Sequence, residues 1–208
     1  MDASAAKANL VLLNGPPRAG KSLASKVLAD LIQDEVRVLY LSEQIKRATH
    51  CAYGMFDVPF DFFEDCKDAE SELFFGLTPR QAYIAHSEEY MKKVHGADVF
   101  VHMFLKRLTD RIPPISVVPD VGFQAEIDCM RRVWRGGNIV LLRMHRAGTS
   151  FAGDSRRFVV GGPGVKEIDI YNETLDQLRA DLGEVARGLL APQATPGLVP
   201  QDVEQTFI

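Results

Sequence analysis

Residues 9–22 read NLVLLNGPPRAGKS, an apolar run followed by a glycine-containing loop and a Lys-Ser pair. The run over residues 9–13 is typical of a buried parallel strand. Beyond the loop, Leu23, Val27 and Leu31 recur every four residues and predict an amphipathic helix. Glycines let a backbone wrap closely around an anion with its N–H groups pointing inward. The pattern G-x4-G-K-S between a strand and a helix therefore predicts a loop that binds the phosphates of a nucleoside triphosphate.

This phosphate-binding loop contains the residues that we expect to hold ATP, namely Gly15, Arg18, Ala19, Gly20, Lys21 and Ser22. Lys21 is expected to reach the β- and γ-phosphates and to act in catalysis, and the Ser22 hydroxyl is expected to ligate Mg²⁺. The positive end of the following helix dipole adds to the attraction for phosphate. The predicted cofactor is therefore Mg²⁺, with ATP as the phosphoryl donor.

Apolar strand patterns and helical periodicities alternate along the rest of the chain. Further strands are predicted at residues 36–41, 115–120, 138–143 and 165–170, and helices at 78–95, 99–110, 123–134 and 175–189. Such alternation is typical of an α/β doubly wound fold with a parallel sheet, here of about five strands. We expect residues 1–190 to form a single domain and residues 191–208 to form a flexible tail.

Composition narrows the class of protein. The chain has 208 residues, 46% of them hydrophobic and 25% charged, with a formal net charge of −4, so it has no general attraction for nucleic acid. No stretch approaches a signal peptide or a membrane span. The cysteines (Cys51, Cys66 and Cys129) and the histidines lack metal-ligand spacing, and we expect reduced thiols. The prediction is a cytoplasmic protein with neither nucleic-acid nor membrane partners; a homodimer is left open.

The middle of the chain is less regular. Residues 42–77 mix aromatics with acids, and short helices and loops are expected there without assigned boundaries. At residues 78–81, Thr78 predicts a helix cap, Pro79 suits the first helical position and Gln81 completes a capping box. Residues 144–164, rich in Gly and Arg, predict a mobile loop. A loop of this kind suits a small-molecule kinase, in which a lid closes over the transferring phosphoryl group and excludes water.

Several motifs together resemble those of the P-loop nucleoside monophosphate kinases, and more closely those of the deoxynucleoside monophosphate kinases of tailed bacteriophages. They are LTPRQ at 77–81, GADVF at 96–100, DVGFQAE at 120–126 and NETL at 172–175, and the resemblance covers residues 10 to about 182. It implies ATP-dependent phosphorylation of a (deoxy)nucleoside monophosphate to the diphosphate, in the host cytoplasm if the chain is phage-encoded. It also implies a helical acceptor-binding insertion at 42–110 (the helical insertion) and a lid loop at 144–164.

The chain departs from the family pattern at three places. Gly122 stands where family members usually carry Arg, and Ala125 where they carry Asn. In the lid, Arg156 and Arg157 follow Asp154-Ser155, where the family commonly has an acidic stretch.

Candidate acceptor ligands lie in the helical insertion and at a strand end. Arg80 has a planar fork that can hold a phosphate through two parallel hydrogen bonds, although a solvated arginine is the alternative. Asp120, after the third strand, is a candidate for acceptor binding or for holding a water on Mg²⁺, with a helix cap as the alternative. The remaining acceptor candidates are Lys46, Gln81 and Glu88. For Lys46 and Glu88, a solvated surface position is the alternative.

Four arginines are candidate cations near the transferring phosphoryl group: Arg143 and Arg146 as catalytic residues, and Arg156 and Arg157 in the lid. One well-placed arginine is worth about 10³-fold or more in rate, because phosphoryl transfer spreads negative charge over the equatorial oxygens. We expect only one or two of the four to contact phosphate. Two alternatives remain open: a kinase of another small metabolite such as phosphomevalonate, and a nucleotide-binding regulatory or assembly protein with little turnover.

Overall fold

The computed structural model describes residues 8–33, 36–108, 113–134 and 136–191. Five strands form one parallel sheet in the order β2-β3-β1-β4-β5. Their bounds are β1 (Asn9–Asn14), β2 (Val36–Val38), β3 (Ile115–Val118), β4 (Ile139–His145) and β5 (Val165–Tyr171). The predicted α/β doubly wound fold with a five-stranded parallel sheet is confirmed.

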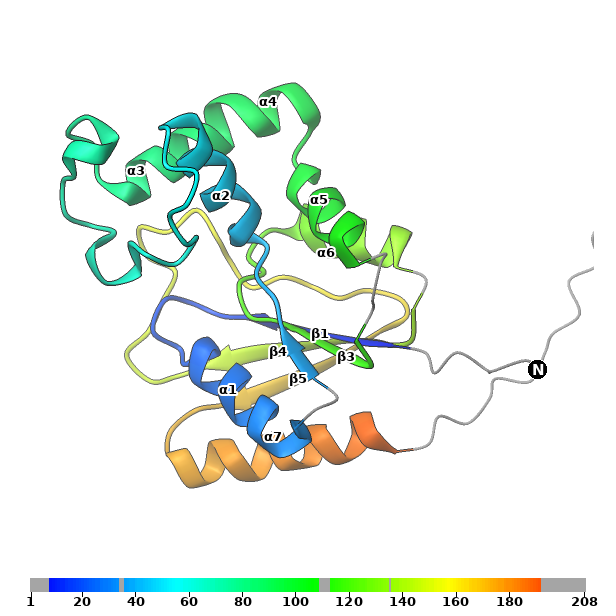
Figure 1. Ribbon diagram of the computed structural model, residues 1–208. Helices are drawn as coiled ribbons and strands as arrows, with labels where there is room; N and C mark the ends of the chain where they lie inside the picture. The colour runs from blue at the N-terminus through cyan, green and yellow to red at the C-terminus, as the bar shows by residue number, and fades with distance from the viewer. Residues whose placement is uncertain (1–7, 34–35, 109–112, 135, 192–208) are drawn as a thin grey trace, which may run out of the picture.

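Both faces of the sheet are covered, which explains why its central strands are apolar throughout. Val11 and Leu13 pack toward α1 (Lys21–Ile32) and α7 (Leu175–Leu190). Leu10 and Leu12 pack on the opposite side toward α5 (Val99–Leu108) and α6 (Gln124–Val133). Figure 1 shows α1 and α7 beneath the sheet and α5 and α6 above it. None of the helices in the described part of the chain is long and apolar enough to cross a membrane.

Two predicted boundaries are wrong, each for a physical reason. The second strand ends at Val38, because the N–H groups of Leu41 and Ser42 donate to the Asp120 carboxylate and not to a neighbouring strand. The predicted lid loop begins too early, because Met144 and His145 belong to β4 and pair with Ile170 and Tyr171 of β5. The loop therefore spans residues 146–164 (the 146–164 loop).

The described part of the helical insertion, residues 42–108, is made of short helices above the carboxyl end of the sheet. They are α2 (Ser42–Ala52), η2 (Glu64–Cys66), η3 (Glu72–Phe74), α3 (Pro79–Ile84), a π-helical segment η4 (Ala85–Met91), α4 (Lys92–His95) and α5. The predicted capping box is confirmed, since the Gln81 N–H donates to Thr78 Oγ1 at 3.1 Å and the Thr78 N–H to Gln81 Oε1 at 2.9 Å. Residues 109 and 110 of the predicted insertion and residues 192–208 of the predicted tail lie outside the described residues.

A small aromatic core holds the insertion together. Phe63 and Phe74 are buried there and pack against the ring of His50. The buried His50 also lies 2.8 Å from the Tyr83 hydroxyl through Nε2. This cluster is separate from the two sheet-facing cores, so the part of the insertion before α5 has a core of its own, whereas α5 packs on the sheet.

Candidate functional site

The phosphate-binding loop follows β1, and its two glycines occupy positions that exclude a side chain. At Gly15 a Cβ atom would lie 2.6 Å from the Met144 carbonyl oxygen of β4. Gly20 has a φ of +95° and passes against the Asn172 side chain, which a Cβ would overlap. The lack of room for a side chain therefore explains Gly15, and both the lack of room and the left-handed backbone conformation explain Gly20.

Lys21 begins α1 and folds back over the loop. Its Nζ donates to the carbonyl oxygens of Gly15 at 2.6 Å and Pro16 at 2.8 Å. Burial, with the nearby positive charge of Arg156, lowers the pKa of the Lys21 amine to about 8. The Ser22 hydroxyl is at the exposed first turn of the same helix, and Arg18 and Ala19 lie within the loop.

Two asparagines that sequence reasoning did not single out as site residues anchor this loop. Asn14 is fully buried; its amide donates to the carbonyls of Val121 (3.0 Å) and Arg157 (3.1 Å), and its oxygen accepts from the Val159 N–H (3.1 Å). Asn172 donates to the Ala19 carbonyl at 3.0 Å. A polar residue closing an apolar strand was the available signal for Asn14, and the NETL motif was the signal for Asn172. Together they tie the loop to β3, to the 146–164 loop and to the start of α7.

Asp120 follows β3 at the carboxyl edge of the sheet. Its Oδ1 accepts from the Leu41 N–H at 3.0 Å and its Oδ2 from the Ser42 N–H at 2.8 Å. A carboxylate at this position is favoured by the dipole of α2. The helix cap considered as the alternative role of Asp120 is thus made to α2, and not to the helix that directly follows Asp120 in the chain.

Glu126 performs the comparable task for α6. Its Oε2 accepts from the N–H groups of Gly122 (2.8 Å) and Phe123 (3.0 Å). Burial raises the pKa of this carboxyl to about 7, against the lowering effect of the two amides. The Asp120 and Glu126 carboxylates at the β3–α6 junction therefore both accept hydrogen bonds from backbone N–H groups.

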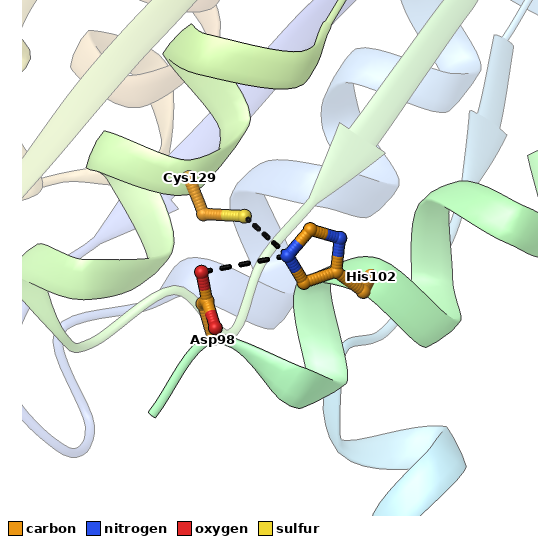
Figure 2. A group of neighbouring side chains, drawn as sticks. All are labelled: Asp98, His102 and Cys129. Atoms are coloured by element: carbon orange, nitrogen blue, oxygen red, sulfur yellow. Dashed lines mark hydrogen bonds and ion pairs between the residues drawn. The ribbon is translucent and has the colours of Figure 1, made fainter. Parts of the chain in front are cut away.

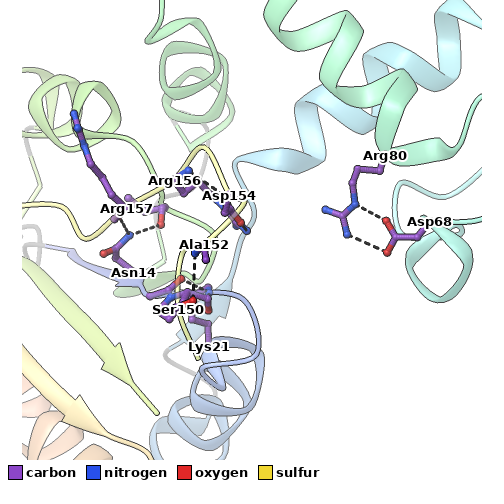
Figure 3. Close-up of polar contacts among 12 residues, drawn as sticks. Asn14, Lys21, Asp68, Arg80, Ser150, Ala152, Asp154, Arg156 and Arg157 are labelled. Atoms are coloured by element: carbon purple, nitrogen blue, oxygen red, sulfur yellow. Dashed lines mark hydrogen bonds and ion pairs between the residues drawn. The ribbon is translucent and has the colours of Figure 1, made fainter. Parts of the chain in front are cut away.

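Arg156, in the 146–164 loop, lies close enough to Lys21 for its positive charge to lower the pKa of that amine. Its guanidinium binds Asp154 through Nε (2.9 Å) and Nη2, and these bonds lower the pKa of Asp154 to about 2 (Figure 3). Its aliphatic stem passes over Gly122, where a Cβ would lie 2.6 Å from Arg156 Cγ and closer still to Cδ. Any side chain at position 122 would displace the Arg156 stem, so glycine at this position leaves room for the arginine.

The other predicted arginines lie apart from this contact. Arg143, on β4, is bound by two carboxylates of β5, with Nε 3.0 Å from Asp169 Oδ1 and Nη1 2.9 Å from Glu167 Oε2. Arg146 donates to the Arg18 carbonyl at 3.3 Å, so it borders the phosphate-binding loop. Arg157 is exposed, and in Figure 3 its side chain points away from Lys21 while its carbonyl receives the bond from Asn14.

On the helical insertion, Arg80 forms a two-pronged pair with Asp68. Nε lies 2.6 Å from Oδ1 and Nη2 lies 3.2 Å from Oδ2, with both side chains largely exposed. Figure 3 shows this pair across from the loop that carries Asp154 and Arg156. The hydrogen bonds to Asp154 raise the pKa of Arg156, whereas burial and the positive charge of Arg80 lower it, so the two guanidinium groups influence each other.

The remaining acceptor candidates are each engaged within the insertion. Lys46 pairs with Glu64, and its Nζ lies 5.7 Å from the centre of the Phe60 ring. The Gln81 side chain closes the capping box through its oxygen. Glu88 accepts from Lys92 Nζ at 2.6 Å. The structure brings Lys21, Arg146, Arg156 and Asp120 to the carboxyl edge of the sheet. Arg80 faces this edge from the insertion, Lys46 is held within the insertion by Glu64, and Arg143 is held by β5.

No family model matches this chain, and no curated protein matches its sequence. Among solved structures, it is similar to a candidate kinase from Chloroflexus aurantiacus, with 12% identity over 87% of this chain and 98% of the other and a TM-score of 0.46. A gluconokinase from Sinorhizobium meliloti matches with 13% identity over 88% and 96% of the two chains and a TM-score of 0.39. Thymidylate kinase from Candida albicans matches with 12% identity over 88% and 92% and a TM-score of 0.31.

Proposed function

We propose that this protein transfers the γ-phosphoryl group of ATP to a (deoxy)nucleoside monophosphate and so forms the diphosphate, acting in nucleotide biosynthesis in the cytoplasm, that of a host if the chain is phage-encoded. The observation that supports the proposal is a series of three cations from three separate segments. Lys21 belongs to the phosphate-binding loop, Arg156 to the 146–164 loop and Arg80 to the helical insertion. The positive charge of Arg156 lowers the pKa of Lys21, and the positive charge of Arg80 acts in the same direction on the pKa of Arg156. A transfer between two phosphates needs positive charge along its whole path.

Each of these cations is satisfied by a group of the protein that a phosphate oxygen could replace. Lys21 binds two carbonyl oxygens, Arg156 binds Asp154 and Arg80 binds Asp68. The carboxylate pairs have the same planar two-oxygen geometry that suits an arginine fork for phosphate. The site is thus equipped to exchange internal anions for those of two substrates.

In the proposed mechanism, the amides of the phosphate-binding loop and Lys21 hold the donor phosphates, and Arg80, supported by Lys46, holds the acceptor phosphate. Arg156, with Arg146 beside the loop, faces the charge that develops on the transferring group. The exposed Ser22 hydroxyl and, through water, the Asp120 carboxylate would hold Mg²⁺, which prefers oxygen ligands and would neutralise part of the charge of the triphosphate. Positioning and electrostatics provide the catalysis, and no covalent enzyme intermediate is formed.

The test is an ADP-release assay with ATP, Mg²⁺ and each of dGMP, dTMP, dCMP, dAMP and the ribonucleotides in turn. One or more acceptors should stimulate ADP release well above the rate with ATP alone. The Arg80→Ala variant should raise the KM for the acceptor and leave ATP affinity unchanged. Arg179→Ala, an exposed arginine on α7, is the matched control and should change neither.

Two results would contradict the proposal. Failure of every monophosphate to stimulate ADP release would exclude this acceptor class. Calorimetric titration separates the remaining readings, because a kinase has a second saturable site for its acceptor and a nucleotide-binding regulatory protein has only the ATP site. If Arg80→Ala lost as much affinity for ATP as for the acceptor, Arg80 would not be a specific ligand of the acceptor phosphate.

A further inference from the structure

Away from the proposed phosphoryl-transfer site, three potential metal ligands meet between α5 and α6 (Figure 2). Asp98 and His102 lie one turn apart at the start of α5, and Cys129 projects from α6. Cys129 Sγ is 3.6 Å from His102 Nε2, and His102 Nε2 is 3.4 Å from Asp98 Oδ2. The three donor atoms all lie within 4.8 Å of one another.

Without a metal, hydrogen bonds link these side chains: Asp98 accepts from the Cys129 thiol and from Arg132, and burial together with this carboxylate raises the pKa of the thiol to about 11. The thiol and the carboxylate both approach the same ring nitrogen, Nε2. When Nε2 carries a proton it donates to the carboxylate, and the thiol then donates to Asp98 as well, so the carboxylate is the group that the other two side chains share. The separation of 3.4 Å between nitrogen and carboxylate oxygen is also longer than the roughly 2.7–2.9 Å of a charge-assisted bond.

A cation at a common point would satisfy all three groups. Zinc binds thiolate at about 2.3 Å, imidazole at about 2.0–2.1 Å and carboxylate at about 2.0–2.2 Å in tetrahedral geometry. Those lengths and the tetrahedral angle give separations of about 3.6 Å between sulfur and nitrogen and about 3.4 Å between nitrogen and oxygen. The observed separations, 3.6 Å and 3.4 Å, have these values without any movement of the side chains.

We propose that Asp98, His102 and Cys129 form a zinc site, with water as the fourth ligand. A thiolate with an imidazole selects zinc over Mg²⁺ or Ca²⁺, which prefer oxygen ligands alone. Arg132 donates to Asp98 Oδ2 at 2.9 Å, a second contact of the kind that orients a ligating carboxylate. Cys129 is buried whereas the His102 side chain is 54% exposed, so the metal has an access route from solvent and the thiol proton can leave along it.

The site would hold α5 against α6, because its ligands come from both helices. Metal that binds only when the two helices are docked stabilises the folded chain. This proposal is independent of the phosphoryl-transfer function, since none of its three ligands is among the residues proposed to bind ATP, Mg²⁺ or the acceptor.

The test starts from a full-length Cys51→Ser, Cys66→Ser variant without a histidine tag. Both replaced thiols are exposed, so Cys129 remains the only thiol in the chain. Titration with Co²⁺ should give a thiolate-to-cobalt charge-transfer band that saturates at one equivalent, together with tetrahedral d–d bands. Zinc should remove both signals, and excess Mg²⁺ should leave them unchanged.

Zinc affinity is then measured by competition with a chromophoric chelator. Cys129→Ser, His102→Asn and Asp98→Asn should each lower it by at least about tenfold. His95→Asn, an exposed histidine at the end of α4, is the matched control and should leave it unchanged. Circular dichroism in the presence of a chelator establishes that each variant is folded.

Two outcomes would overturn the proposal. One is a folded starting variant that shows no charge-transfer band at stoichiometric Co²⁺. The other is zinc binding whose affinity is the same in His102→Asn as in the starting variant, which would locate the metal elsewhere.

Discussion

The phosphate-binding loop and the helical insertion both present a cation to the carboxyl edge of the sheet, but they hold it in different ways. Lys21 is partly buried and bound by backbone carbonyls of its own loop, which two buried asparagines anchor. Arg80 is exposed and bound by the side chain of Asp68, which is also exposed. The loop is therefore a preorganised cradle, whereas the insertion holds its arginine by an ion pair that is easily exchanged.

This difference suggests a division of labour. The backbone of the loop is anchored by Asn14 and Asn172, so the donor side should bind its phosphates with little backbone rearrangement, and only the Lys21 side chain should exchange partners. An exposed ion pair contributes little to stability and is screened by salt, so the acceptor side should adapt at small cost to an incoming phosphate. The four predictions that follow test this comparison, beginning with the largest expected effect.

Removing the Lys21 amine should abolish the function of the cradle. Lys21→Ala is expected to reduce ATP turnover by about 10³-fold or more, because the charge facing the donor phosphates is lost in a partly water-excluded site. The measurement is acceptor-stimulated ADP release. Lys26→Ala, an exposed lysine on the same helix, is the control and should retain full activity. Retained turnover in Lys21→Ala would mean that the loop does not bind the donor as proposed.

Adding one methyl group at Gly122 should misplace Arg156. The new Cβ would meet the Arg156 stem at Cγ, Cδ and, at 3.2 Å, Cβ, so the side chain must leave its path over the glycine. We expect kcat to fall roughly 10- to 100-fold, the size of effect that a misplacement of about 1 Å produces. Gly183→Ala on α7, where the nearest atom is 3.9 Å away, is the control. An unchanged kcat in Gly122→Ala would mean that Arg156 does not stabilise the transition state.

The difference between the two halves also decides what could be predicted from the sequence. The strand–loop–helix arrangement around residues 15–20, the capping box of Thr78 and Gln81, and the alternation of strands and helices depend on near neighbours, and the structure confirms them. Asn14 and Asn172 were missed as anchors because their partners lie 107 to 153 positions away in the sequence. Asp68 and Asp154 were missed because an acid in a loop gives no sign of which arginine it will meet.

The same limit applies to residues whose partners lie in another segment of the chain. Asp120 was expected to bind the acceptor or a water on Mg²⁺, with a cap for the following helix as the alternative, yet its oxygens bind the amides that begin α2. His102 and Cys129 are 27 positions apart and form no metal-binding motif in the sequence, although the packing of α5 on α6 brings them together. Spacing rules detect sites built within one segment and miss sites built between segments.

The Glu126 carboxyl provides a test of the backbone at Gly122 and Phe123, whose N–H groups it binds. Because burial raises its pKa to about 7, the folded protein holds this proton more tightly than the unfolded chain does. The fold therefore loses stability as pH rises from about 4.5 through about 7. Glu126→Gln removes the charge and keeps an oxygen that accepts from the Gly122 and Phe123 amides, so its free energy of unfolding should exceed that of the native chain by on the order of 1–3 kcal/mol near pH 8.

Urea unfolding near pH 8 and again near pH 5 provides the measurement, and the advantage of Glu126→Gln should shrink at the lower pH. Glu173→Gln, an exposed acid before α7, should show no such dependence. A pH-independent difference between Glu126→Gln and the native chain would mean that Glu126 is not protonated in the fold near neutral pH.

The smallest expected effect tests the exchangeable side of the comparison. In the proposed mechanism, Asp68 competes with the acceptor phosphate for the Arg80 fork. The hydrogen bonds to that arginine lower the pKa of Asp68. Asp68→Asn should therefore lower the acceptor KM by roughly two- to fivefold, the range expected for an exposed ion pair, and leave the KM for ATP unchanged. Raising the salt concentration should reduce the difference, since the pair is exposed. Glu70→Gln, an exposed acid nearby in the chain, is the control. A higher acceptor KM in Asp68→Asn would reverse the interpretation, because Asp68 would then be orienting Arg80 for the phosphate and the insertion would be as preorganised as the loop.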